Sequence, residues 1–494
     1  PTSSRHPASS HLLAFYFCRI KRFLGSLSLA VVLNLAVKPG WILLENLVQD
    51  RLGHAAFGTF TALSALALVV AAVSDVGLTQ HLTRRVAADS EFLSEHLPTL
   101  LPLKGWLSGV FLALMLGIGW ALGYDARALG WLALIGLTML LTQYAQFLRG
   151  VVQGQQRFGL DAGLSVVEKG GLLVAVGALL LVNQASMTRY ISTRLAAAAV
   201  VCGVFSVVVA RLLGGWVWPR LNRSGARGLL RESLALALIT LLYGLNERID
   251  AVMIERLAGP REAGLYAGAY RWTDAAMMYL WTVLPLFFAR FAHAAAAAAD
   301  RAALLRVGQR VAAAPLLLVV VGVLMRGDVL FWQFANSTPA ELSRMTWCLR
   351  LLFLNVLVHG FFAVYSTLLT STYLERPVAR LVAVSIGLNV LLNLWLLPRG
   401  GAVAAAANTL VCAVAVSGGY VWLVARRTPT AVPWALLARL AVAFGLALGA
   451  WFVLKVWLDN WLIESVLMTG MFVVILFLTG LVTRAELRAL RTAA

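Results

Sequence analysis

Long apolar runs separated by short polar connections recur along almost the whole chain. A run of about 20 apolar residues is long enough to cross a hydrocarbon core of roughly 30 Å as a helix. The long continuous runs differ from the short alternating strands of a membrane barrel, so we expect an all-α polytopic membrane protein. We predict fourteen spans, at residues 25–48, 57–80, 97–122, 128–148, 160–182, 195–217, 233–254, 264–289, 304–325, 346–371, 377–397, 402–424, 433–457 and 461–481.

The composition agrees with this pattern and excludes a soluble globular enzyme. Of the 494 residues, 61% are hydrophobic and 13% are charged, and the mean hydropathy is +0.83. An ordinary soluble domain has about 25% charged residues. The four cysteines lie far apart, without the paired spacing of a zinc site or a disulfide framework. We therefore expect no metal and no cofactor.

The net charge of +19 follows the topology of the chain. With the amino terminus inside, the inner connections hold more than twice as many Lys and Arg residues as the outer ones. The positive-inside rule then places both termini in the cytoplasm, and we expect the net charge to reflect topology rather than a nucleic-acid partner. Four arginines in the largest inner connection recur every three or four residues, which would place them on one helix face. They are expected either to contact anionic lipids or to guide an anionic headgroup.

Two segments of the chain share a short pattern. Asp50-Arg51-Leu52 is followed by Gly58, and Glu255-Arg256-Leu257 is followed by Gly264, at offsets of 205 and 206 residues. Parallel repeats of this kind are found in transporters, whose cargo site lies between the two lobes near the membrane midplane. We expect a tail at 1–24, an N-lobe at 25–217, a basic linker at 218–232, a C-lobe at 233–425 and two further spans at 426–494.

The same segments resemble a known family. The motifs are Leu52-Gly53, Phe57-Gly58, Ser74-Asp75-Val76-Gly77-Leu78, Arg149-Gly150 with Gln153-Gly154, Arg248-Ile249-Asp250, Gly264-Leu265-Tyr266 with Ala269-Tyr270-Arg271, and Asn389 to Asn393 with Pro398 and Gly401. In this order they are similar to the polysaccharide biosynthesis (Wzx-type) flippases of the multidrug/oligosaccharidyl-lipid/polysaccharide exporter superfamily. The resemblance implies that a polyprenyl-diphosphate-linked oligosaccharide is moved between leaflets by alternating access. Lys38 and Glu45 depart from the more apolar first span of many members.

The first span has one polar face. Asn34, Lys38, Trp41 and Glu45 are separated by steps of four, three and four residues, which align them on one side of a helix. A charge at the bilayer centre costs at least about 2.5–3.5 kcal/mol, so this face is expected to line a wet cavity that binds the cargo. In the alternative interpretation, Lys38 and Glu45 neutralise each other and only aid packing.

Three arginines complete the candidate cargo site. Arg248 and Arg271 lie in the first spans of the second lobe and are expected to converge with Lys38 on the diphosphate, because Arg offers bidentate hydrogen bonds. Arg350 lies nearer the outer end of its span. The alternative is that Arg248 and Arg271 pair locally with neighbouring carboxylates and hold the helices in register.

Four intramembrane carboxylates are candidates for coupling to a proton or a sodium ion. Each of them could instead serve packing or local pairing alone. Asn389 and Asn393, in the eleventh span, are interpreted as hydrogen-bonding residues between helices. The four carboxylates are Glu45, Asp75, Asp250 and Asp274.

Three functions remain open at this point. The leading hypothesis is a multi-pass flippase of the bacterial inner membrane that moves a lipid-linked oligosaccharide. Its expected partners are membrane lipids, and a glycan polymerase and assembly proteins are possible ones. A drug/cation antiporter of the same superfamily is the alternative. A membrane glycan polymerase is the third, although the outer connections are short. The chain has no phosphate-binding Gly-Lys-Ser/Thr loop, so ATP-driven transport would need a separate subunit.

Overall fold

The computed structural model describes residues 39–89, 92–182, 186–218, 244–245, 248–293, 298–428, 430, 432–457 and 460–482. Throughout these ranges the chain forms helices and connections, with no strand. Nine segments within them are long and apolar enough to cross a membrane. The expected all-α polytopic membrane fold is confirmed.

The chain divides into two compact units. The first contains the residues up to Leu52 together with Phe60–Ile249, and the second contains Gly53–Thr59 together with the chain from Asp250 onward. The expected basic linker lies almost wholly at residues 219–243, outside the described ranges. The division into lobes, linker and additional spans therefore stays a prediction.

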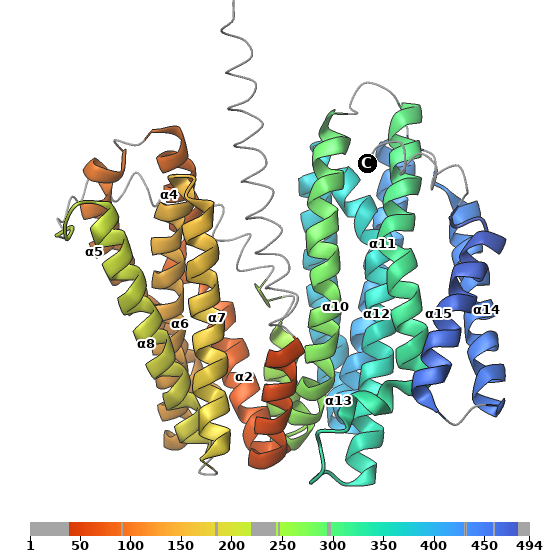
Figure 1. Ribbon diagram of the computed structural model, residues 1–494, viewed down its shortest axis with the longest axis horizontal. Helices are drawn as coiled ribbons and strands as arrows, with labels where there is room; N and C mark the ends of the chain where they lie inside the picture. Colours follow the sequence, from red (N-terminus) through yellow and green to blue (C-terminus); the bar gives the residue numbers. More distant parts are fainter. Residues whose placement is uncertain are drawn as a thin grey trace, which may run out of the picture. The chain divides into compact units, whose positions relative to one another are not determined.

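The first unit is a helical bundle built around α6. Helix α6 packs on α4, α5, α7 and α8, and Figure 1 shows these helices as the yellow and orange group. Large side chains such as Leu100, Phe147 and Phe205 are fully buried among them. The elements are a helix at 39–52, α2 (His54–Val70), of which residues 60–70 belong to this unit, α3 (Ala72–Asp75), α4 (Leu78–Ala88), α5 (Phe92–Ala121), α6 (Ala126–Gly154), α7 (Phe158–Leu181) and α8 (Met187–Leu212).

The second expected span is not one helix. Residues 57–80 are divided among α2, α3 and α4, and the chain takes left-handed backbone angles at Val76 (φ 45°) and Gly77 (φ 76°). Such angles are strained for a β-branched residue, so Val76 marks a break that the surrounding packing must hold. Val76 is buried among the core residues of the unit. The apolar pattern reports burial but not backbone direction, which is why it missed the break.

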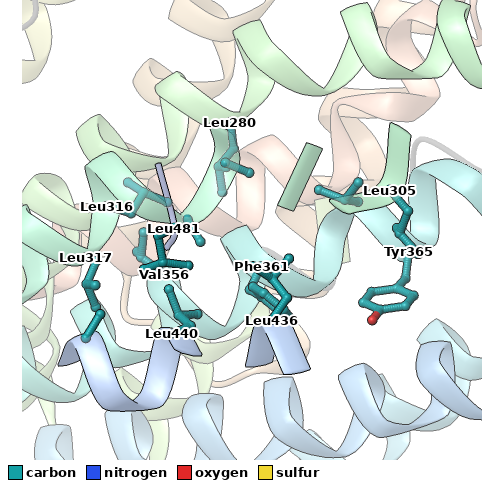
Figure 2. Packing of buried hydrophobic residues seen from close by; sticks show 14 of the residues in the cluster. Leu280, Leu305, Leu316, Leu317, Val356, Phe361, Tyr365, Leu436, Leu440 and Leu481 are labelled. Atoms are coloured by element: carbon teal, nitrogen blue, oxygen red, sulfur yellow. The ribbon is translucent and has the colours of Figure 1, made fainter. Parts of the chain in front are cut away.

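The second unit is built around α12, which packs on α10, α11 and α13. Helices α14 and α15 pair with each other and pack on α11 (Figure 1). Figure 2 shows the core where Leu280, Leu316, Phe361 and Leu440 meet from four of these helices. The elements are a helix at 248–257, α10 (Pro260–His293), α11 (Ala298–Arg326), η2 (Gly327–Phe331), α12 (Pro339–Ser371), α13 (Glu375–Arg427), α14 (Trp434–Trp457) and α15 (Trp461–Leu478).

Helix α13 has two arms that meet at Gly401, in agreement with the two expected spans. Gly401 has φ 56° and ψ −139°, which is not helical and which disfavours any side chain. The Glu262 carboxylate accepts a hydrogen bond from the Ala402 backbone N–H at 2.9 Å and binds Arg344 Nη2 at 2.5 Å. The carboxylate therefore provides an acceptor for a free backbone N–H at the start of the second arm. A Cβ at Gly401 would overlap this carboxylate.

The two glycines at equivalent repeat positions are in contact within the second unit. A Cβ at Gly58 would overlap the Pro260 carbonyl group, and a Cβ at Gly264 would overlap the His54 carbonyl group. The first turns of α2 and α10 thus cross backbone to backbone. The short sequence match between the repeats accordingly has a packing reason, because only glycine permits this distance.

Candidate functional site

A buried carboxylate in the second unit is surrounded by neutral polar groups. Asp250, 8% exposed, accepts hydrogen bonds from Asn393 Nδ2 at 2.8 Å and from Thr409 Oγ1 at 3.1 Å. Asn393 Nδ2 also donates to Asn389 Oδ1 at 3.0 Å. Asn408 Nδ2 donates to Asn393 Oδ1 at 2.8 Å and to the Asn389 carbonyl oxygen at 3.0 Å. We call these five residues the Asp250 network.

The Asp250 network joins three helical segments. Asp250 lies on the helix at 248–257, Asn389 and Asn393 lie on the first arm of α13, and Asn408 and Thr409 lie on the second. In the part of the chain that the structure describes, no Lys or Arg pairs with Asp250. A buried carboxylate beside amide and hydroxyl oxygens offers the ligand type that hard cations prefer. No group of three or more His, Cys, Asp or Glu side chains suited to a metal ion occurs among the described residues.

In the first unit, two of the predicted residues meet around an arginine that the sequence analysis missed. Glu45 Oε1 accepts hydrogen bonds from Arg194 Nη1 at 3.0 Å and from the Tyr190 hydroxyl at 3.2 Å. The Arg194 guanidinium lies 5.4 Å from the Trp41 ring centre and 5.3 Å from that of Phe60. We expected the sixth span to begin at residue 195, which placed Arg194 in a connection. Helix α8 begins earlier, at Met187, and carries Arg194 two turns inward.

Asp75 also has a cationic partner that we did not anticipate. Lys104 Nζ lies 2.7 Å from Asp75 Oδ1, and the Lys104 side chain is 3% exposed. The Thr79 hydroxyl donates to the same carboxylate oxygen at 2.6 Å, and Lys104 lies 5.1 Å from the Phe147 ring centre. A single lysine inside the apolar third span was the signal that could have revealed the pair, since a charge at this depth needs a partner.

A third ionic cluster connects α6 and α7. Arg149 Nε lies 2.7 Å from Asp161 Oδ1, and Arg149 Nη1 lies 3.1 Å from Glu168 Oε2. Gln153 Nε2 donates to Asp161 Oδ2 at 3.1 Å. We expected Arg149 in the connection after the fourth span, but α6 extends to Gly154 and keeps Arg149 on the helix.

Gly150 and Gly154, which follow Arg149 and Gln153 by one residue each, face α4 instead of α7. A Cβ at Gly150 would lie 2.7 Å from Thr83 Oγ1, and a Cβ at Gly154 would lie 2.7 Å from the Val86 Cβ on α4. The Arg-Gly and Gln-Gly pairs of the sequence therefore combine ion pairing to α7 with close packing on α4. These contacts hold α6 against both α7 and α4.

The predicted arginines of the cargo site lie against aromatic rings or are half-buried. The Arg271 guanidinium is 4.4 Å from the Phe57 ring centre, and that of Arg350 is 5.3 Å from the ring centre of Trp347. Arg248 is half-buried. A guanidinium is attracted to the face of an aromatic ring by the cation–π interaction, which holds these two arginines in place.

The convergence of the cations on one cavity stays a prediction. Asn34 and Lys38 lie outside the described residues, and Arg248 and Arg271 belong to different units. Asp274 is half-buried on α10.

Comparisons with known proteins agree with this architecture. Residues 44–292 match the family model described as "Polysaccharide biosynthesis protein". No curated protein sequence matches the chain.

Several solved structures share the fold. A structure of the lipid II flippase MurJ in an inward closed conformation has a TM-score of 0.68 and 11% identity, and the match covers 91% of this chain and 97% of that one. An inward-facing multidrug resistance MATE transporter has a TM-score of 0.60 and 14% identity over 78% of this chain and 93% of its own. A transporter of the MOP superfamily from Pyrococcus furiosus has a TM-score of 0.52 and 15% identity over 80% and 92%.

At these identities the solved structures establish the fold alone, and membership rests on the family model. That model matches half of the chain, from the first described helix through α10. The multi-pass membrane protein described above therefore belongs to the polysaccharide biosynthesis protein family.

Proposed function

We propose that the protein is a flippase that moves a polyprenyl-diphosphate-linked oligosaccharide across the bacterial inner membrane for surface polysaccharide synthesis. The observation that carries the proposal is the family match, combined with a fold shared with the lipid II flippase over 91% of the chain. The similar structures are those of transporters and flippases, which favours translocation over catalysis.

We infer that the Asp250 network couples this movement to a proton or a sodium ion. Its ligand atoms come from both arms of α13 and from the helix at 248–257, so a bound cation would tie these three segments together. A ligand shifts a conformational equilibrium by its differential affinity for the two states. A site assembled from separate segments provides such a difference when the segments move.

Among the candidate carboxylates, Asp250 is the best suited to this role. Glu45 and Asp75 already bind Arg194 and Lys104, whereas the contacts of Asp250 within the described ranges come from neutral groups. A carboxylate that already pairs with a Lys or Arg side chain gains less binding free energy from a further cation.

The cargo headgroup is proposed to bind the cationic and polar residues of the predicted cavity. Arg248, Arg271 and Arg350 would hold the diphosphate by bidentate hydrogen bonds, together with Lys38. Asn34 and Trp41 would contact the sugar or the isoprenoid region beside it.

The direct test is transport by the purified full chain in proteoliposomes that carry a fluorescent lipid-linked oligosaccharide. We expect flipping that depends on a proton or sodium gradient, and an Asp250→Asn variant that loses at least tenfold in gradient-dependent rate. Asp328→Asn is the matched control, because Asp328 is an exposed carboxylate in the same unit. Equal rates for the Asp250 variant and the control would overturn the coupling role and leave the flippase proposal standing.

A second test addresses the cargo. Deletion of the gene should cause lipid-linked oligosaccharide to accumulate while surface polysaccharide is lost, as measured by mass spectrometry of polyprenol-linked sugars. Neutral replacement of Lys38, Arg248 and Arg271 should reproduce this result. If lipid-linked oligosaccharide accumulates in the deletion strain but the purified wild-type protein does not flip it in proteoliposomes, the blocked step is a different one.

A drug/cation antiporter is the second candidate, favoured by the similarity to the MATE transporter. An exporter of cations needs a cavity of net negative charge, so removal of Lys38, Arg248 and Arg271 should spare it. Unchanged glycans together with greater drug sensitivity in the deletion strain would select this function. Polymer formation by the purified protein alone would instead support a glycan polymerase.

A further inference from the structure

A cavity of about 430 Å³ lies in the second unit, apart from the Asp250 network. It is bounded by α11 and by the start of α14, and three arginines line it. We call it the arginine cleft. Its lining residues are Arg306, Arg310, Val432, Pro433, Trp434, Ala435, Leu436 and Arg439.

The three arginines come together from two helices. Arg306 and Arg310 are one turn apart on the same face of α11, and Arg439 lies on the second turn of α14. The terminal Nη1 of Arg439 lies 3.3 Å from the position of a Cβ at Gly480, where φ is +66°. Glycine at this turn therefore leaves room for the guanidinium after α15 ends.

The electrostatic character of the arginine cleft is cationic. None of the described residues that line it is Asp or Glu. Trp434 to Leu436 form the first turn of α14 and line the cleft together with Pro433 before them, so the positive end of the helix dipole adds to the three side-chain charges. Three planar guanidinium groups around one cavity offer the donor arrangement that binds phosphate oxygens bidentately.

The surroundings of the cleft are those of a membrane interface. Trp434, at the first position of α14, is 63% exposed, and tryptophan is enriched where the hydrocarbon meets water. Val307, Val311 and Val442 are 41%, 40% and 55% exposed on the two helices that carry the arginines. An acyl chain that descends from a headgroup in the cleft would therefore find apolar side chains beside it.

We propose that the arginine cleft binds a phosphate group, carried by an anionic membrane lipid. The volume suits a phosphate with a small polar substituent, and the exposed valines accept the lipid tail. None of the residues proposed above to bind the cargo lines the arginine cleft, and the proposal does not rest on the identity of the cargo. A lipid bound there would fix α14 against α11.

The test uses the full chain in detergent, with native mass spectrometry to measure binding of phosphatidylglycerol, phosphatidylcholine and inorganic phosphate. A cluster of basic residues binds an anionic lipid about fivefold more tightly per charge, so Arg306→Gln/Arg310→Gln/Arg439→Gln should weaken phosphatidylglycerol binding about 100-fold. The single variants Arg306→Gln and Arg439→Gln give intermediate steps of about fivefold. They keep the test informative if the triple variant does not fold.

The matched control removes three exposed arginines from the ends of α13, as Arg376→Gln/Arg380→Gln/Arg427→Gln. The expected result is that this control binds phosphatidylglycerol like the wild type. Equal losses in the two triple variants would show diffuse attraction to charge and overturn the proposal. Equal binding of phosphatidylcholine would overturn the anionic preference, and binding of inorganic phosphate as tight as that of phosphatidylglycerol would overturn the lipid source.

Discussion

The ion pair between Lys104 and Asp75 gives the sharpest prediction for stability. Lys104 Nζ is 2.7 Å from the carboxylate and the lysine side chain is 3% exposed, so water cannot replace the partner. Removal of one member of a buried pair costs about 3–5 kcal/mol, because the other charge is left without compensation. We therefore expect Asp75→Asn, which leaves the buried Lys104 without its carboxylate, to lower the free energy of unfolding of the first unit by this amount, and Lys104→Met to cost less because Asp75 is 23% exposed.

The double variant Lys104→Met/Asp75→Asn should recover most of the loss. Neutral replacement of both members of a buried pair is often close to neutral for stability. The two single variants and the double variant form a thermodynamic cycle, and we expect a coupling energy of about 2–4 kcal/mol between the two sites.

The assay is thermal unfolding of the full chain in detergent. A loss of 3–5 kcal/mol in a unit of this size should lower Tm by about 6 °C or more. Arg84→Met is the control, because Arg84 is exposed in the same unit and its removal should change stability by less than about 0.5 kcal/mol. A double variant as unstable as the sum of the two single variants would refute the reasoning. A double variant that is stable but transports nothing would assign Asp75 a coupling role in addition.

Two further predictions concern backbone strain and the second ion pair of the first unit. Gly401→Ala should lower the free energy of unfolding by about 1–3 kcal/mol, since it forces a side chain into a left-handed backbone conformation. Gly387→Ala is the control: its Cβ would lie in open space, so Tm in the same thermal assay should stay unchanged or rise slightly. Arg194→Gln should remove the ion pair between Arg194 and Glu45 and lower the free energy of unfolding by up to about 3–5 kcal/mol, as measured by denaturant unfolding. Arg211→Gln, at an exposed position of the same helix, should cost little, and equal losses in the two variants would contradict the assigned pairing.

The helical membrane fold was predictable because hydropathy reports it directly. The two arms of α13 were expected as separate spans at 377–397 and 402–424 from the apolar runs, and the non-helical backbone at Gly401 lies between them. Asn389 and Asn393 were interpreted as hydrogen-bonding residues between helices, and both join the Asp250 network. In each case the residue type itself indicates what its surroundings must provide: an apolar run needs burial or lipid, and an intramembrane asparagine needs a hydrogen-bonding partner.

The ion pairs were not predictable in the same way. Lys104 and Asp75 lie 29 positions apart and meet only after the helices pack, so no spacing rule connects them. Arg194 and Arg149 were hidden by errors of a few residues in span boundaries, which placed both in connections. The break at Val76 is invisible in an apolar run, because backbone angles leave no trace in hydropathy.

The Arg149-Gly150 and Gln153-Gly154 pairs bind α7 and α4 at the same time, which limits how this part of α6 can change in length. A helix turns by about 100° per residue, so one residue inserted between Gly150 and Gln153 would rotate everything after it by that angle. Gly154 would leave Val86, and at the same time Gln153 would leave Asp161. Substitutions can affect these contacts one by one, whereas an insertion or deletion removes them together. We therefore expect this stretch to accept changes of residue far more readily than changes of length.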